Sequence, residues 1–146
     1  MGFWKRLIGE RTEEVDFYEE GLAMLNAGKY HEALTSLRLA LRDAPTDAAV
    51  LQQIAIAQTR IGMTDEAVRT YRKVLSINAD SPGAHYGIAF LLIKKGDPIK
   101  GAEHLRTFLA SPPRGPDAAR WVQHAETTLE DLPLPESGET ESAPPA

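Results

Sequence analysis

Residues 15–45 read VDFYEEGLAMLNAGKYHEALTSLRLALRDAP, and this stretch decides the fold. Its apolar residues recur every three or four positions on either side of Gly28, which predicts two amphipathic helices. Glycine readily adopts the left-handed conformation that ends many helices, and Pro45 cannot continue the second helix. The stretch therefore predicts a helix, a tight turn and a second helix.

The same pattern returns every 34 residues, at Gly28, Gly62 and Gly96. Other residue types share this spacing. They are Ala33, Ala67 and Gly101; Leu41, Leu75 and Leu109; and Pro45, Ala79 and Pro113. Self-similarity at one period is typical of repeat proteins, in which each unit buries its apolar face against the next unit.

These residues resemble the tetratricopeptide repeat family. The first unit fits the family pattern closely, whereas Ala79 and Gly101 depart from it in the second and third units. The resemblance implies an all-α fold, an α-solenoid of three helix-turn-helix repeats with a C-terminal capping helix. The predicted parts are an amphipathic N-terminal segment at 1–13, repeats at 14–47, 48–81 and 82–115, a capping helix at 116–131, and a disordered, acidic, proline-rich tail at 132–146.

Polar residues before two prolines indicate where helices begin. Ser81 before Pro82 and Asp97 before Pro98 are each predicted to cap a helix whose first residue is proline. Thr64 is predicted to cap the second helix of the second repeat.

Composition excludes several classes of protein. The chain has 146 residues, a formal net charge of −5 and no cysteine. Disulfide scaffolds and thiolate metal sites are therefore excluded, and a cytoplasmic location is expected. The acidic balance disfavours nucleic acid as a partner. Because no metal-spaced histidines, phosphate loop or nucleophile motif occurs, we expect no catalytic residues, no metal, no cofactor and no enzymatic activity.

The resemblance also implies a concave groove lined by the first helix of each repeat. Mapping the family's inward positions onto this chain gives an apolar centre flanked by amides and by two cations. The predicted contacts are Tyr18, Leu22, Ile56, Tyr86 and Phe90 for the apolar centre, Asn26, Gln52 and Gln53 for the amides, and Arg60 and Lys94 for the cations. An apolar stripe of this kind marks either a site for an external partner or a surface filled by the chain's own N-terminal segment or last helix.

The N-terminal segment lies outside the repeats. Its large apolar residues share one face of a predicted helix, while Lys5 and Arg6 lie off that face. The predicted docking residues are Phe3, Trp4, Leu7 and Ile8. The segment could lie on an anionic membrane surface, dock in its own groove or a neighbour's, or extend freely.

The function favoured by these observations is a non-catalytic protein-interaction module or adaptor. It would bind a peptide or helix of a protein partner in the groove, with Arg60 and Lys94 biasing it toward acidic partners. One alternative is a self-assembling scaffold in which one chain's N-terminal segment enters the next chain's groove. A second alternative is a peripheral membrane tether through residues 1–11, with membrane contact no deeper than the surface.

Overall fold

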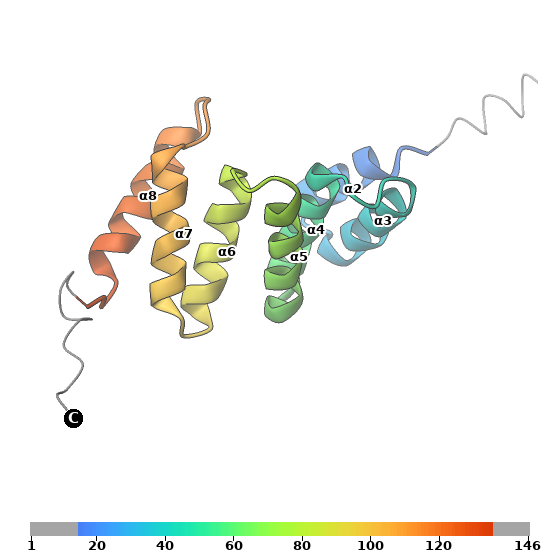
Figure 1. Ribbon diagram of the computed structural model, residues 1–146. Helices are drawn as coiled ribbons and strands as arrows, with labels where there is room; N and C mark the ends of the chain where they lie inside the picture. Colours follow the sequence, from blue (N-terminus) through green and yellow to red (C-terminus); the bar gives the residue numbers. More distant parts are fainter. Residues whose placement is uncertain (1–14, 136–146) are drawn as a thin grey trace, which may run out of the picture.

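The computed structural model describes residues 15–135, which form seven helices in a row (Figure 1). The predicted all-α solenoid is confirmed. The helices are α2 (Phe17–Asn26), α3 (Tyr30–Asp43), α4 (Ala48–Ile61), α5 (Thr64–Ile77), α6 (Pro82–Lys94), α7 (Pro98–Ala110) and α8 (Ala118–Asp131). The N-terminal docking residues Phe3, Trp4, Leu7 and Ile8 lie outside the described residues.

The first six of these helices form three hairpins, α2 with α3, α4 with α5, and α6 with α7, and each hairpin packs on the next. Left-handed glycines follow the first helix of each hairpin: Gly28, Gly62 and Gly96 have φ values of 75°, 94° and 90°. Residues with a Cβ adopt this conformation only at a cost, which explains why glycine recurs at this position. The last helix, α8, packs against α7.

Capping was predicted correctly at two of three positions. The Ser81 side chain accepts from the Ala84 amide, and the Asp97 side chain accepts from the Lys100 amide. The prediction for Thr64 is wrong, because Met63 is the capping residue and no side chain caps α5. The turn after α4 is so tight that α5 begins one residue earlier than expected, with the Met63 amide donating back to the Gln58 carbonyl at 2.9 Å.

Small residues lie where the two helices of each hairpin cross. Each hairpin contributes one from each of its helices, and all six are buried. They are Gly21 and Ala33, Ala55 and Ala67, and Ala89 and Gly101. Because they add little or no side chain, the two helix backbones can approach closely.

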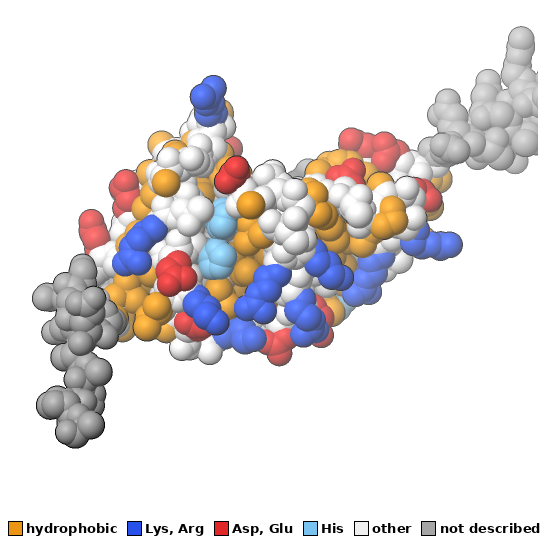
Figure 2. All heavy atoms as spheres, in the orientation of Figure 1, with side chains coloured by type: hydrophobic (Ala, Val, Ile, Leu, Met, Phe, Trp, Pro, Cys, Tyr) orange, Lys and Arg blue, Asp and Glu red, His pale blue; other side chains and the backbone are white. Residues whose placement is uncertain are grey.

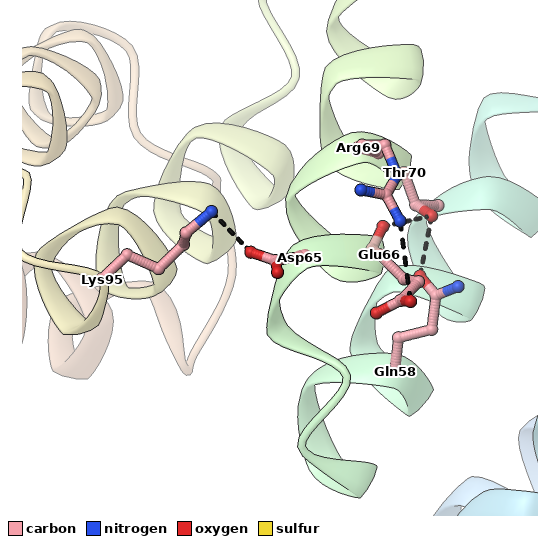
Figure 3. Close-up of polar contacts among 6 residues, drawn as sticks. All are labelled: Gln58, Asp65, Glu66, Arg69, Thr70 and Lys95. Atoms are coloured by element: carbon pink, nitrogen blue, oxygen red, sulfur yellow. Dashed lines mark hydrogen bonds and ion pairs between the residues drawn. The ribbon is translucent and has the colours of Figure 1, made fainter.

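Polar contacts join the second and third repeats. Figure 3 shows Lys95, which follows α6, reaching Asp65 at the start of α5. Within the second repeat, the Thr70 hydroxyl donates to the Gln58 side-chain carbonyl at 2.7 Å. Both residues are buried, and the Thr70 hydroxyl also lies 2.9 Å from the Glu66 carbonyl oxygen, so it is the Gln58 side-chain oxygen that depends on this contact.

His85 forms a second link between these repeats and also contacts His104 within the third repeat. His85 Nε2 lies 2.7 Å from the Ala79 carbonyl oxygen, and His85 Nδ1 lies 2.9 Å from His104 Nδ1. Since a carbonyl only accepts, His85 carries its proton on Nε2, and His104 must donate from Nδ1. Burial of the His104 ring, with smaller contributions from His85 and Arg72, lowers the pKa of His104, which Glu103 partly opposes.

Gly101→Ala is expected to destabilise the protein, although alanine is the family's usual residue at this position. The added Cβ would lie 2.6 Å from Ile93 Cγ1 and 2.9 Å from the Ala89 backbone oxygen. Overpacking of this kind costs about 1–3 kcal/mol, whereas the helix propensity of alanine returns about 1 kcal/mol. Urea unfolding followed by circular dichroism should show a lower free energy of unfolding for Gly101→Ala than for the wild-type chain. Thr107→Ala, at an exposed position of α7, is the matched control. A gain in stability for Gly101→Ala would contradict the crossing geometry.

The free energy of unfolding is expected to fall as the pH is lowered from about 7 to 5. Because the pKa of His104 is lower in the folded chain than its ordinary value, the unfolded chain takes up this proton more readily. The stabilisation is therefore present above the ordinary pKa and is lost as the pH falls through the folded value. His104→Asn keeps a donor toward His85 Nδ1 without titrating. Urea titrations at several pH values should show a shallower dependence for this variant, and an identical slope would refute the assignment.

Candidate peptide-binding groove

A groove of about 720 Å³ is enclosed by α4, α6 and α8. Its volume lies within the range of sites that bind small molecules or peptide side chains. The lining residues come from two repeats and from the last helix. They are Gln52, Ile56, Thr59, Arg60, Tyr71, Ser81, Pro82, Gly83, Tyr86, Gly87, Phe90, Phe108, Pro113, Trp121 and His124.

The second helices of the second and third hairpins supply two buried aromatic side chains, Tyr71 from α5 and Phe108 from α7. The Tyr71 ring lies directly against Gly87, where any Cβ would collide with the ring and its hydroxyl. Burial raises the pKa of Tyr71 to about 12, partly opposed by a hydrogen bond with Thr59. The hydroxyl therefore stays protonated at neutral pH, and it adds a polar group to a largely aromatic surface.

Gln52 joins α4 to the start of α6. Its side-chain oxygen accepts from the Ser81 hydroxyl at 3.2 Å, and its amide nitrogen lies against Gly83. The absence of a side chain at Gly83 is therefore needed for this contact. Gln52 is positioned by the fold, at the wall of the groove, rather than projecting freely into it.

The third wall is α8, which is held on two of the predicted groove residues. His124 stacks on Phe90 with ring centres 4.6 Å apart and an interplanar angle of 6°. The Tyr86 hydroxyl lies 2.6 Å from His124 Nδ1, and the Tyr86 and Trp121 ring centres are 6.4 Å apart. The last helix therefore does more than cover the end of the stack, because it also lines the groove.

The structure brings together half of the predicted groove residues. Those that line the cavity are Gln52, Ile56, Arg60, Tyr86 and Phe90. Those that lie outside its lining are Tyr18, Leu22, Asn26, Gln53 and Lys94. The cavity thus spans the second repeat, the third repeat and α8, and the first repeat does not contribute to it.

Tyr18 lies in a different environment, at the N-terminal end of the stack. It lines a separate shallow depression together with Val15, Asp47 and Val50. Burial raises the pKa of the Tyr18 hydroxyl, and the nearby carboxylates of Asp47 and Glu19 raise it further. The surroundings of Tyr18 are therefore negatively charged, whereas the only charged side chain that lines the groove among the described residues is the cation Arg60.

Sequence reasoning missed Tyr71, Phe108, Trp121 and His124 as groove residues. The first two belong to the second helix of their hairpins, which the family pattern assigns to packing. The last two belong to α8, which the sequence predicted only as a capping helix at 116–131. The small residue Gly87 was the one available signal, because it leaves room for the Tyr71 ring.

Among the described residues, the groove lining contains one cation, Arg60, and no carboxylate. The Arg60 guanidinium lies 5.8 Å from the centre of the Tyr30 ring, at the edge of the first repeat. Arg120 is close enough to Tyr86 to lower the pKa of its hydroxyl, although burial raises this pKa by more. Figure 2 shows a different balance over α5 and α7, where Lys and Arg side chains are interspersed with Asp and Glu. The groove is therefore cationic at its edge within an acidic chain.

Between Val15 and Pro135, no cluster of three or more histidine or acidic residues is arranged to hold a metal ion. No helix in this part of the chain has the length and apolar character needed to cross a membrane.

Comparisons with known proteins agree with this architecture. The Tetratricopeptide repeat family model matches residues 49–81. The photosystem I assembly protein Ycf3 of Parasynechococcus marenigrum is 30% identical over 122 residues, which cover 81% of this chain and 65% of that protein. The TPR repeat-containing protein MJ1428 of Methanocaldococcus jannaschii is 38% identical over 77 residues, 53% of this chain and 14% of the relative. The chain therefore spans less than two thirds of these relatives.

Among solved structures, the fold is similar to the Yersinia enterocolitica type III secretion chaperone SycD, determined in complex with a peptide of the translocator YopD. The TM-score is 0.72 at 17% identity, and the match covers 78% of this chain and 87% of that chain.

A row of antiparallel helical hairpins around a groove defines the class of helical-repeat solenoids. The 34-residue period, the match of residues 49–81 to the repeat model and the named relatives support assignment of the chain to the tetratricopeptide repeat family.

His124→Ala is expected to loosen α8 while leaving the three hairpins intact. The substitution removes both the stack on Phe90 and the contact with Tyr86, whereas Ala125 is the single fully buried residue of α8. Amide hydrogen exchange should become faster in α8 and stay unchanged in α4. Glu126→Ala, at an exposed position of the same helix, controls for the loss of a polar side chain. Equal protection of α8 in all three proteins would show that His124 does not hold the wall.

Proposed function

We propose that the protein is a non-catalytic interaction module that holds an extended peptide of a protein partner in the groove between α4, α6 and α8. One observation carries the proposal. The groove combines a buried aromatic surface with a cationic edge, and none of its lining residues between Val15 and Pro135 is a carboxylate, although the chain as a whole is acidic. Aromatic anchors and arginine are the side chains enriched at the energetic centres of interfaces.

The comparisons support this class of function. The Yersinia chaperone is described with a peptide of its translocator, and the cyanobacterial relative is named as an assembly protein. Members of this repeat family are typically non-catalytic. The chain would therefore act by holding another protein, and a cytoplasmic setting is part of the same proposal.

Within the groove, each predicted residue has a distinct role in this proposal. Ile56 and Phe90 supply apolar contact, and Gln52, fixed by Ser81, hydrogen-bonds the peptide backbone. Arg60 favours acidic residues in the peptide. For partners longer than the cavity, contacts would continue along the row. The residues proposed for that extension are Tyr18, Leu22, Asn26, Gln53 and Lys94.

Ile56→Asp is the sharpest test of the groove, because Ile56 belongs to α4 and lines the groove. Peptides selected from a random displayed library against the wild-type chain serve as probes. A carboxylate at position 56 would be desolvated by a bound peptide, so peptide affinity should fall at least about tenfold. Helical content, measured by circular dichroism, should not change.

Arg69→Asp is the matched control, since Arg69 is exposed on α5 and pairs only with Glu66 of the same helix. It introduces the same side chain outside the groove lining, and peptide affinity should be retained. If the selected peptides are insensitive to Ile56→Asp and lose binding with Arg69→Asp, the binding site lies elsewhere and the proposal fails.

A further inference from the structure

The chemistry of the groove narrows the kind of segment that fits it. Tyr86, Phe90, Trp121 and His124 present aromatic surfaces at one end of the groove, and proline rings pack well on such surfaces. Arg60, at the edge of the groove, can form ion pairs with the carboxylates of a ligand. No carboxylate among the described lining residues would repel these ligand groups. A segment that carries both prolines and glutamates is therefore complementary to this groove.

The chain itself contains such a segment. Residues 132–146 read LPLPESGETESAPPA, with four prolines, three glutamates and no lysine or arginine. The N-terminal segment is a poorer match, because Lys5 and Arg6 adjoin its apolar residues. In the groove, these two cations would lie near the cation Arg60 and would find no carboxylate among the described lining residues.

The tail is also attached close to the groove. It follows α8, the helix that carries Trp121 and His124, which ends at Asp131. At 1.5 Å per residue, His124 lies about 10 Å back along the helix from Asp131. Residues 136–146 can extend over about 35 Å. The tail can therefore turn back and reach the groove of its own chain.

We propose that the acidic, proline-containing segment 136–146 binds in the groove of its own chain and competes there with the partner peptide. This inference rests on the proposed function, because it takes the same groove as the binding site. Exposed ion pairs are individually weak, but tethering gives the tail an effective concentration in the millimolar range. Weak contacts are then sufficient for partial occupancy, and a stronger partner can still displace the tail.

The test uses the full chain with Trp4→Phe, which leaves Trp121 as the single tryptophan. The tail variant carries Glu136→Gln, Glu139→Gln and Glu141→Gln. A matched control carries Glu126→Gln, Glu130→Gln and Asp131→Asn, which remove the same number of carboxylates from exposed positions of α8. Quenching of Trp121 by acrylamide reports access to the groove. The tail variant should be quenched more strongly than the parent chain, while the α8 control should match the parent.

Two additions identify the contact. At about 1 M salt, where charges are screened within about 3 Å, the parent chain should approach the tail variant. A synthetic peptide of residues 132–146, added to the tail variant, should restore protection of Trp121. The same peptide with its glutamates replaced by glutamine should not restore this protection. Arg60→Gln should weaken the protection that the unmodified peptide gives. A library peptide that binds in the groove should gain about 2- to 10-fold in affinity for the tail variant.

Equal quenching in the parent chain and the tail variant would overturn the inference. Protection that disappears on dilution would assign the contact to the tail of a second copy and would also overturn it. These results differ from a failure of the proposed function. If the library peptides require Ile56 but bind the parent and the tail variant equally, the groove is a binding site and the tail does not occupy it. If no library peptide depends on Ile56, the proposed function fails whatever the quenching shows.

Discussion

The close crossing of the two helices within each hairpin is the constraint on which the rest of the structure depends. At each crossing, glycine or alanine lies on both helices, and in the third hairpin an added Cβ on Gly101 would approach the backbone oxygen of Ala89. Larger residues would push the helices apart and break the register in which one hairpin packs on the next. The stacking of hairpins then sets α4 beside α6, and their facing residues become two walls of a groove.

This constraint explains why the fold could be predicted from the sequence. A packed crossing tolerates only small residues and a tight turn requires a left-handed glycine, so both requirements recur in every repeat and are visible as a 34-residue period. The start of α5 could not be read so directly. Thr64 has the chemistry of a capping residue, but α5 already begins at Thr64, with Met63 as the capping residue and the Met63 amide bonded to the Gln58 carbonyl.

The groove was predicted less completely, for a physical reason. The family pattern predicts which face of a helix points toward the groove, but it does not predict which residues that face contacts. Tyr86 meets His124, which is 38 residues away, and Tyr71 reaches the groove only because Gly87 lacks a side chain. Such contacts depend on how α8 docks, and α8 lies outside the repeated pattern.

The docking of α8 also sets the rigidity of the groove. The walls formed by α4 and α6 are anchored by several buried residues each, whereas α8 buries only Ala125 completely. The partly buried Val122 and Leu129 pack beside Ala125 on the core of the third repeat, and the aromatic contacts of Trp121 and His124 add to what holds this wall in place. Trp121 and His124, which would meet a ligand, thus also help to fix α8. A ligand that packs against Trp121 and His124 would add contacts to the least anchored of α4, α6 and α8, so binding and the ordering of this wall are coupled.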